Sequence, residues 1–195
     1  VQRSGLDVAY SQGFNPTMKI SMGIALPLFE ESLCELVDID IFDDLTSDEL
    51  KNILQKYLPD GCRIVNISEI KERGQSFKAI DITAQWAEYK IDLCKNQKIP
   101  LYEMKDFVYN TNRVLSGEEI VIAKKDKKGL LKTTNFKNSV KSYEFRDDSL
   151  FIRWKTGQKT DVPALRADIL MEKIAPEIMF NIVRTRLFDE NMQVL

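Results

Sequence analysis

The densest charged feature of the chain is a run of lysines between positions 124 and 141. Its members are Lys124, Lys125, Lys127, Lys128, Lys132, Lys137 and Lys141, and one acid, Asp126, interrupts them. Ammonium groups this close repel one another unless water or an anion matches them, so a hairpin that carries them could contact phosphates. The simpler interpretation is a solvated hairpin whose lysines discourage edge-to-edge aggregation. Both interpretations stay open.

Two arginines near the end of the chain form a second cationic candidate. Arg184 and Arg186 are separated by one residue, and alternate residues of a strand share a face. Two guanidinium groups on one face could hold a phosphate or a carboxylate in bidentate fashion. The alternative is structural pairing with the acidic segment Asp38–Asp40 or with Glu144.

An aromatic residue, Phe14, lies at the tip of a sequence rich in turn residues such as Gly13 and Pro16. If exposed, it could serve as a recognition platform beside polar neighbours. The sequence favours the alternative, a plug folded under the loop, because most large apolar side chains are buried. The candidate binding residues of this segment are Tyr10, Gln12, Phe14, Asn15 and Lys19.

The chain contains no histidine, which excludes Ser-His-Asp and Cys-His catalysis and histidine metal ligands. Cys34, Cys62 and Cys94 lie far apart and form no C-x-x-C pair, so we expect buried, reduced cysteines. Asp38 and Asp40 share a strand face and could hold a divalent cation, but such pairs are more often the wet side of a strand. The sequence contains no P-loop, no dinucleotide glycine fingerprint and no radical-SAM cysteine triad. We therefore predict no metal and no cofactor.

Composition describes a globular chain without a strong charge preference. Its 195 residues are 44% hydrophobic, and 28 Lys+Arg against 30 Asp+Glu give a net charge of −2. The overall charge therefore weakens a nucleic-acid interpretation without excluding a local patch. No apolar run reaches the roughly 20 residues of a membrane span, and no signal peptide is visible, so we expect a cytoplasmic protein.

Periodicity and capping signals divide the chain into helices and strands. In the first part the predicted elements are strand Met18–Met22, strand Leu33–Phe42, a helix after the capping box of Thr46 and Glu49, and strand Cys62–Ile70. In the second part they are strand Trp86–Leu93, helix Leu101–Asn110, the paired segments Glu119–Lys125 and Leu130–Thr134, the hairpin Val140–Arg146 with Leu150–Lys155, a helix from Val162 to Ile174, and strand Phe180–Phe188.

The order of these elements predicts an α+β protein built from two ferredoxin-like βαββαβ pseudo-repeats. The second half gives strand, helix, strand pair, helix and strand. The first half lacks the opening strand and helix of such a unit. We place the boundary in the polar segment Lys71–Ser76, with one domain over residues 1–72 and the other over residues 73–195.

The opening sequence SGLDVAYSQGFNPTMKISMGIALPL, followed by ESLCELVDIDI, resembles an uncharacterised bacterial family. Domains of this family occur alone or fused behind cobalamin-binding radical-SAM proteins. The chain departs from the family pattern at Thr17 and Met18, where the family usually has His-Pro, so no role of that histidine transfers. Family members usually begin with a further strand and helix, so the resemblance implies that the natural protein has more residues at its start.

The element order, the lysine run and the resemblance together predict a radical-SAM-associated accessory module that holds tRNA or rRNA between its two units and presents it to a modifying enzyme. Sheet faces of ferredoxin-like units bind single-stranded RNA by stacking bases on aromatic side chains. The available aromatics are Tyr10, Phe14, Tyr89, Tyr143, Phe145, Phe151 and Trp154. One alternative is a metal-independent RNA-processing enzyme that uses Tyr10, Ser11 and Lys19, although the sequence favours no activity of its own. Another is a protein–protein interaction domain, and the oligomeric state stays open.

Overall fold

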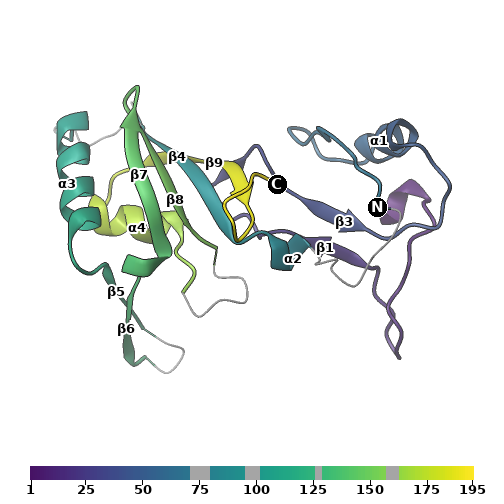
Figure 1. Cartoon of the computed structure of the whole chain (residues 1–195), viewed down its shortest axis with the longest axis horizontal. Coiled ribbons are helices and arrows are strands. Elements are labelled where there is room, and N and C mark those ends of the chain that lie inside the picture. The colour runs from purple at the N-terminus through teal and green to yellow at the C-terminus, as the bar shows by residue number, and fades with distance from the viewer. Residues whose placement is uncertain (71–79, 95–101, 126–128, 157–162) are drawn as a thin grey trace. The chain divides into compact units, whose positions relative to one another are not determined.

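The computed structural model describes residues 1–70, 80–94, 102–125, 129–156 and 163–195 (Figure 1). It contains two compact units, Val1–Ser21 with Val37–Ala79 and Met22–Leu36 with Ile80–Leu195. Helices and several separate sheets confirm the predicted α+β class. The predicted boundary between residues 72 and 73 lies outside the described residues. None of the helices in the described ranges is long and apolar enough to cross a membrane.

The first unit contains short elements. The 3-10 helix η1 (Gln2–Ser4) ends at Gly5, whose φ of 75° is the left-handed conformation that glycine adopts readily. Strand β1 (Ile20–Met22) pairs with β3 (Val37–Ile39). Helix α1 (Ser47–Gln55) begins with the predicted capping box, in which Glu49 N donates to Thr46 Oγ1 and Thr46 N donates to Glu49 Oε2.

The predicted strand Cys62–Ile70 is wrong, because this segment forms no strand with any described residue. Its backbone is instead bound by side chains of α1. Gln55 Nε2 donates to the carbonyl of Cys62 and Gln55 Oε1 accepts from the amide of Ile64, while Lys51 Nζ donates to the carbonyl of Val65. Side-chain hydrogen bonds here replace a strand ladder.

The second unit holds the larger sheet. Its helices are α2 (Ile80–Thr83), α3 (Met104–Ser116), the 3-10 helix η2 (Lys137–Ser139) and α4 (Ala167–Ile174). Its strands are β2 (Glu31–Ser32), β4 (Trp86–Leu93), β5 (Val121–Lys125), β6 (Leu131–Asn135), β7 (Val140–Arg146), β8 (Ser149–Lys155) and β9 (Phe180–Phe188).

Four of these strands have the ferredoxin-like arrangement. Neighbours in the series β9-β4-β8-β7 pair antiparallel, which is the order 4-1-3-2 when these strands are numbered along the chain. Strand β2 adds a parallel edge beside β9, and β5 with β6 forms a separate hairpin between α3 and β7. The order predicted for the second half is therefore present, whereas the described part of the first unit shows only a two-stranded sheet.

Helices α3 and α4 contact each other and cover one face of this sheet (Figure 1). The ring of Phe107 in α3 lies 5.5 Å from that of Phe145 and 4.9 Å from that of Phe180. Tyr89 and Trp154 stack at 4.2 Å in the same core. Tyr89 and Trp154, which the sequence offers as RNA platforms, therefore belong to the core, and Phe145 packs against it.

Candidate nucleic-acid interface

The opposite face of the sheet carries a mixed set of charged and aromatic side chains. Residues paired across two antiparallel strands lie on the same face, and Trp86 pairs with Lys155, Glu88 with Arg153 and Lys90 with Phe151. We call this surface the open face; its charged, polar and aromatic residues include Trp86, Glu88, Lys90, Lys141, Ser142, Glu144, Arg146, Phe151, Arg153, Lys155, Arg186 and Phe188.

Three aromatic residues of the open face lie beside cations; one of them, Phe188, is 4% exposed, and Arg153 Cζ is 5.2 Å from its ring centre. Lys155 Nζ is 4.5 Å and Lys141 Nζ is 5.8 Å from the ring centre of Trp86. Arg146 Cζ is 3.8 Å from the ring centre of Phe151. Phe151 lies opposite Lys90, four residues along β4 from Trp86, so the two rings are about 13 Å apart along the strand direction.

A buried carboxylate occupies the centre of the open face. Glu88 is only 3% exposed, and its Oε2 accepts bonds of 2.7 Å from both Nε and Nη2 of Arg153. Its Oε1 accepts from Thr185 Oγ1 at 3.0 Å and lies 3.9 Å from Arg186 Nε. The single negative charge of Glu88 thus faces the two positive charges of Arg153 and Arg186, so the centre of the open face keeps an excess positive charge.

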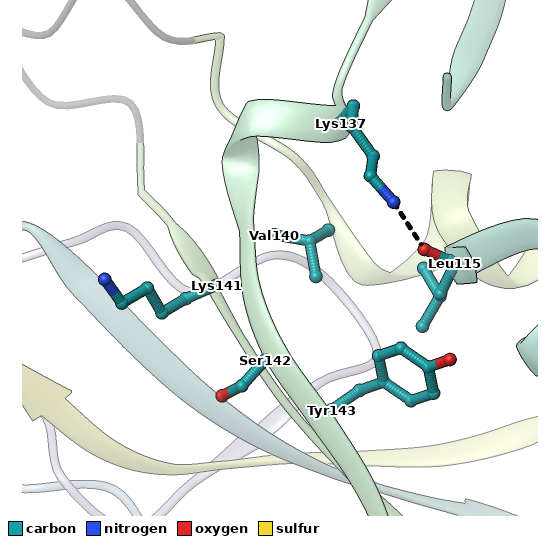
Figure 2. Close-up of a pocket in the computed structure, with 6 residues that line it drawn as sticks. All are labelled: Leu115, Lys137, Val140, Lys141, Ser142 and Tyr143. Atoms are coloured by element: carbon teal, nitrogen blue, oxygen red, sulfur yellow. Dashed lines mark hydrogen bonds between the residues drawn. The ribbon is translucent and has the colours of Figure 1, made fainter. Parts of the chain in front are cut away.

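Two open hollows lie along the edge strand β7. One, of about 280 Å³, is lined by Glu88, Ser142, Tyr143, Glu144, Phe151 and Arg153. The other, of about 360 Å³, is lined by Leu115, Lys137, Val140, Lys141, Ser142 and Tyr143. Figure 2 shows Lys141 and Ser142 on one side of β7, and Val140 and Tyr143 on the other, toward Leu115. The first hollow therefore belongs to the open face, and the second surrounds the edge of the sheet.

The predicted lysine run is distributed among different environments. Lys127 and Lys128 lie outside the described residues, and of Lys124 and Lys125 only the backbone position in β5 is described. Lys132 is exposed and pairs with Lys124 across β5 and β6. Lys137 Nζ donates to the carbonyl of Leu115 at 2.8 Å (Figure 2). Among the members of the run whose side chains are described, Lys141 contacts the open face.

Arg184 is 1% exposed and belongs to the covered face of the sheet. Its Nε donates to Tyr89 Oη at 3.0 Å, its Nη1 to the carbonyl of Ile24 and to Glu35 Oε1, and its Nη2 to the carbonyl of Ala25. The partner carboxylate is Glu35, and neither the segment Asp38–Asp40 nor Glu144. Arg184 therefore ties the segment Met22–Leu36 to the sheet.

The prediction that Arg184 and Arg186 share a face is wrong. Glu88 of β4 pairs with Arg186 of β9, and the next residue of β4, Tyr89, pairs with Arg184. Thr185 is therefore an extra residue of β9 without a partner in the pairing register. This bulge turns the two arginines to opposite faces, because successive residues of β4 point in opposite directions. A two-arginine clamp cannot form on this strand.

Beside Arg184 lies a carboxylate, that of Glu30, which accepts no hydrogen bond from any described residue. Both side-chain oxygens of Glu30 are buried and have no partner in the described structure. Burial raises the pKa of Glu30 to about 7, opposed by the nearby charge of Arg184; Asp168 raises it further and Arg166 lowers it. Burial also raises the pKa of Tyr89 to about 12.

The prediction that Phe14 is a plug is wrong, because its side chain is 100% exposed. Ser11 N donates to the carbonyl of Thr17 at 2.8 Å, and Thr17 N donates to Ser11 Oγ at 3.0 Å. These bonds close a hairpin whose tip needs no apolar side chain beneath it. Among the other predicted contacts of this first-unit segment, Gln12, Asn15 and Lys19 are exposed and Tyr10 is 50% exposed.

The three cysteines have different exposures. Cys34 and Cys94 are partly buried, but Cys62 is exposed, so the prediction of three buried cysteines is wrong for Cys62. Cys34 Sγ donates to the carbonyl of Arg184 at 3.7 Å, and burial raises the pKa of its thiol. Within the described ranges no three cysteine, aspartate or glutamate side chains gather in a way that could hold a metal ion.

Sequence reasoning missed Trp86, Arg153 and Lys155 as candidate site residues. The feature of the sequence that could have identified them is the alternation of core residues with polar or aromatic residues in the strands β4 and β8. Trp86 and Lys90 alternate with Ala87, Tyr89 and Ile91, as Phe151 and Lys155 alternate with residues of the core. Large aromatic residues on the polar side of such a pattern mark a surface, but the pattern alone does not say which side the helices cover.

Comparison with protein families identifies the chain. It belongs to a family described as an uncharacterized protein conserved in bacteria (DUF2344), whose model matches residues 1–167. This match confirms that the resemblance of the opening sequence is to an uncharacterised bacterial domain. Neither the curated proteins nor the solved structures contained a match to the chain.

Proposed function

We propose that this member of the family binds RNA on the open face of its second unit and presents it to a modifying enzyme. The observation that carries the proposal is a sheet face on which two partly exposed aromatic rings, Trp86 and Phe151, lie among lysines and arginines. Base stacking on aromatics combined with phosphate contacts from cations is the usual way in which sheets bind RNA.

The local charge supports this proposal more than the net charge of the chain does. Lys90 is paired with Asp92 at 2.9 Å, and Arg146 with Glu144 at 3.2 Å. Lys141 and Lys155, by contrast, form no ion pair with another described residue. These two ammonium groups lie over the same indole, so a phosphate beside Trp86 would meet two cations that no described acid neutralises.

A second surface supports the partner in the proposal. Leu28, Phe29 and Leu33 of the second unit are 84%, 98% and 69% exposed. Phe29 also has a φ of 66°, which is strained for a residue other than glycine. Exposed apolar side chains on a strained loop favour contact with another protein. A protein–protein interaction domain is therefore the second candidate function, and the family resemblance makes a radical-SAM protein the proposed partner.

RNA binding is tested by fluorescence anisotropy with labelled fragments of bulk cellular RNA at two salt concentrations. We expect the double variant Lys141→Glu/Lys155→Glu to weaken binding at least about tenfold and to lower the slope of log Kd against log salt by about 1 to 2. The matched control is Lys173→Glu, at an exposed position in α4 on the other side of the sheet. No binding at low salt, or an equal effect of the control, contradicts the proposal.

The partner is tested by affinity purification from bacterial cells after nuclease treatment. The proposal expects a radical-SAM protein that the Phe29→Ser variant no longer retains. If the protein is retained only before nuclease treatment, RNA rather than a direct contact joins the two.

A further inference from the structure

The geometry points to unpaired nucleotides as the ligand of the open face, with one base stacked on Trp86 and another on Phe151. This inference rests on the proposed function and specifies the form of RNA that the site accepts.

The first argument is the state of the Trp86 indole. The residue is partly buried, and its Nε1 makes no hydrogen bond with any described group. The ammonium groups of Lys155 and Lys141 lie over the ring. Both groups are carried by long, flexible side chains. A base can take their place over the ring while the ammonium groups move to its phosphate.

The second argument is the environment of Phe151. The guanidinium group of Arg146 lies 3.8 Å from its ring centre, and guanidinium planes stack on bases as aromatic rings do. The hollow of about 280 Å³ opens beside this ring and is lined by the polar side chains of Ser142 and Glu144. A base edge can donate to or accept from these groups, whereas a phosphate would be repelled by the carboxylate.

The third argument is the distance between the two rings. They are about 13 Å apart along the strand direction, and Arg153 lies between them, opposite Glu88. Bases within a duplex are stacked on each other and expose no face. In A-form RNA the deep, narrow major groove also excludes side chains. Only unpaired, splayed bases can therefore reach both rings.

The chain offers an internal control for testing this inference, because it has two tryptophans, Trp86 and Trp154. Trp154 is 1% exposed and stacked on Tyr89, so a ligand on the open face cannot touch it. A change of tryptophan fluorescence on ligand binding therefore reports on Trp86.

The experiment titrates the full chain with an unlabelled single-stranded RNA octamer of mixed sequence and with the same octamer annealed to its complement. We expect the single strand to quench the fluorescence of Trp86 and to bind at least about tenfold more tightly than the duplex. The Trp86→Phe variant should lose the quenching and keep its affinity, while Trp86→Ala and Phe151→Ala should each bind at least about fivefold more weakly. The control Tyr109→Ala removes a 68% exposed aromatic from α3 and should change nothing.

The outcomes separate this inference from the proposed function. If anisotropy shows RNA binding but the single strand leaves the fluorescence of Trp86 unchanged, or if the duplex binds equally well, the inference is wrong and the proposed function stands. If no RNA binds at low salt, the proposed function fails first. The fluorescence titration uses the unaltered chain, so it decides the question even if an alanine variant does not fold.

Discussion

The two faces of the five-stranded sheet use the same residue types for opposite purposes. Arg184 is 1% exposed, and its guanidinium group donates hydrogen bonds to a hydroxyl, two carbonyls and a carboxylate. Arg186, by contrast, is exposed. Trp154 stacks on Tyr89 in the core, whereas Trp86 lies beneath two lysines. The role of each arginine and each tryptophan therefore depends on the face of the sheet on which it lies, and not on its residue type.

That position depends on irregularities of the strands. A shift of register between Glu88 and Tyr89 places Thr185 as an extra residue and separates the two arginines. A second shift, between Val140 and Ser142, leaves Lys141 free to reach the ring of Trp86. Each bulge moves the following side chains to the other face. The open face would have a different composition without them.

The largest expected effect comes from removing the buried arginine. Arg184→Ala leaves the hydroxyl of Tyr89, the carbonyls of Ile24 and Ala25 and the carboxylate of Glu35 without their donor. Breaking a buried charged network in this way costs about 3 to 5 kcal/mol of unfolding free energy. Urea unfolding followed by circular dichroism measures the loss.

The matched control for this change is Arg186→Ala, two positions away on the same strand. Its exposed side chain lies 3.9 Å from Glu88, so we expect a change within about 0.5 kcal/mol. Equal losses in the two variants would contradict the division of roles between the two faces.

The next effect concerns Glu88, the buried acid of the open face. Glu88→Gln replaces a charged pair with Arg153 by a neutral contact, and we expect a loss of about 1 to 3 kcal/mol of unfolding free energy. RNA affinity should rise, because Arg153 and Arg186 are no longer neutralised. Anisotropy and urea unfolding should thus change in opposite directions.

Glu144→Gln is the control for this prediction, because its exposed carboxylate pairs with Arg146 at 3.2 Å. It should leave stability nearly unchanged. A fall in RNA affinity for Glu88→Gln, at equal fold content, would mean that phosphates do not contact these arginines.

The sequence predicts the regular elements well where one face of a segment is buried. The strands β4 and β9 and the hairpin of β7 and β8 have the predicted bounds to within one residue, because apolar alternation is strong there. The capping box of α1 is equally local, since Thr46 and Glu49 lie within one turn. These features need no information from distant residues.

What could not be predicted depends on contacts between distant segments. The single strand expected over Leu33–Phe42 is divided between the two units. Leu33 belongs to the second unit, where its N donates to the carbonyl of Arg184, whereas β3 pairs with β1. The bulge at Thr185 and the bonds from Gln55 that replace a strand at Cys62–Ile70 also involve partners that periodicity does not reveal. The candidate site was incomplete for the same reason.

The third effect is a pH dependence of the covered face. Glu30 has a pKa raised to about 7 in the folded chain, above its usual value, so the folded state holds this proton more tightly than the unfolded state. Its contribution to stability is therefore complete below about pH 4.5 and is lost as the pH rises to about 7. Because the residue is only partly buried, we expect a loss of no more than about 2 kcal/mol.

Glu30→Gln isolates this contribution, because glutamine does not titrate. Urea unfolding of both proteins at pH 5, 6 and 8 should show the variant gaining relative stability as the pH rises. A difference between the two proteins that does not depend on pH would show that the carboxyl is solvated in the folded state.

The smallest effect extends the contrast between covered and exposed aromatics to the first unit. Phe14→Ser should change the unfolding free energy by no more than about 0.5 kcal/mol, because its ring is 100% exposed. Phe107→Ala, at a position that is 0% exposed, should cost about 3 to 5 kcal/mol. A large loss of unfolding free energy in the Phe14→Ser variant would show that the ring of Phe14 is folded under its loop after all. With stability unchanged, the RNA affinity of the same variant tests the exposed ring as a separate stacking surface of the first unit: a loss of at least about fivefold is the size expected for one base.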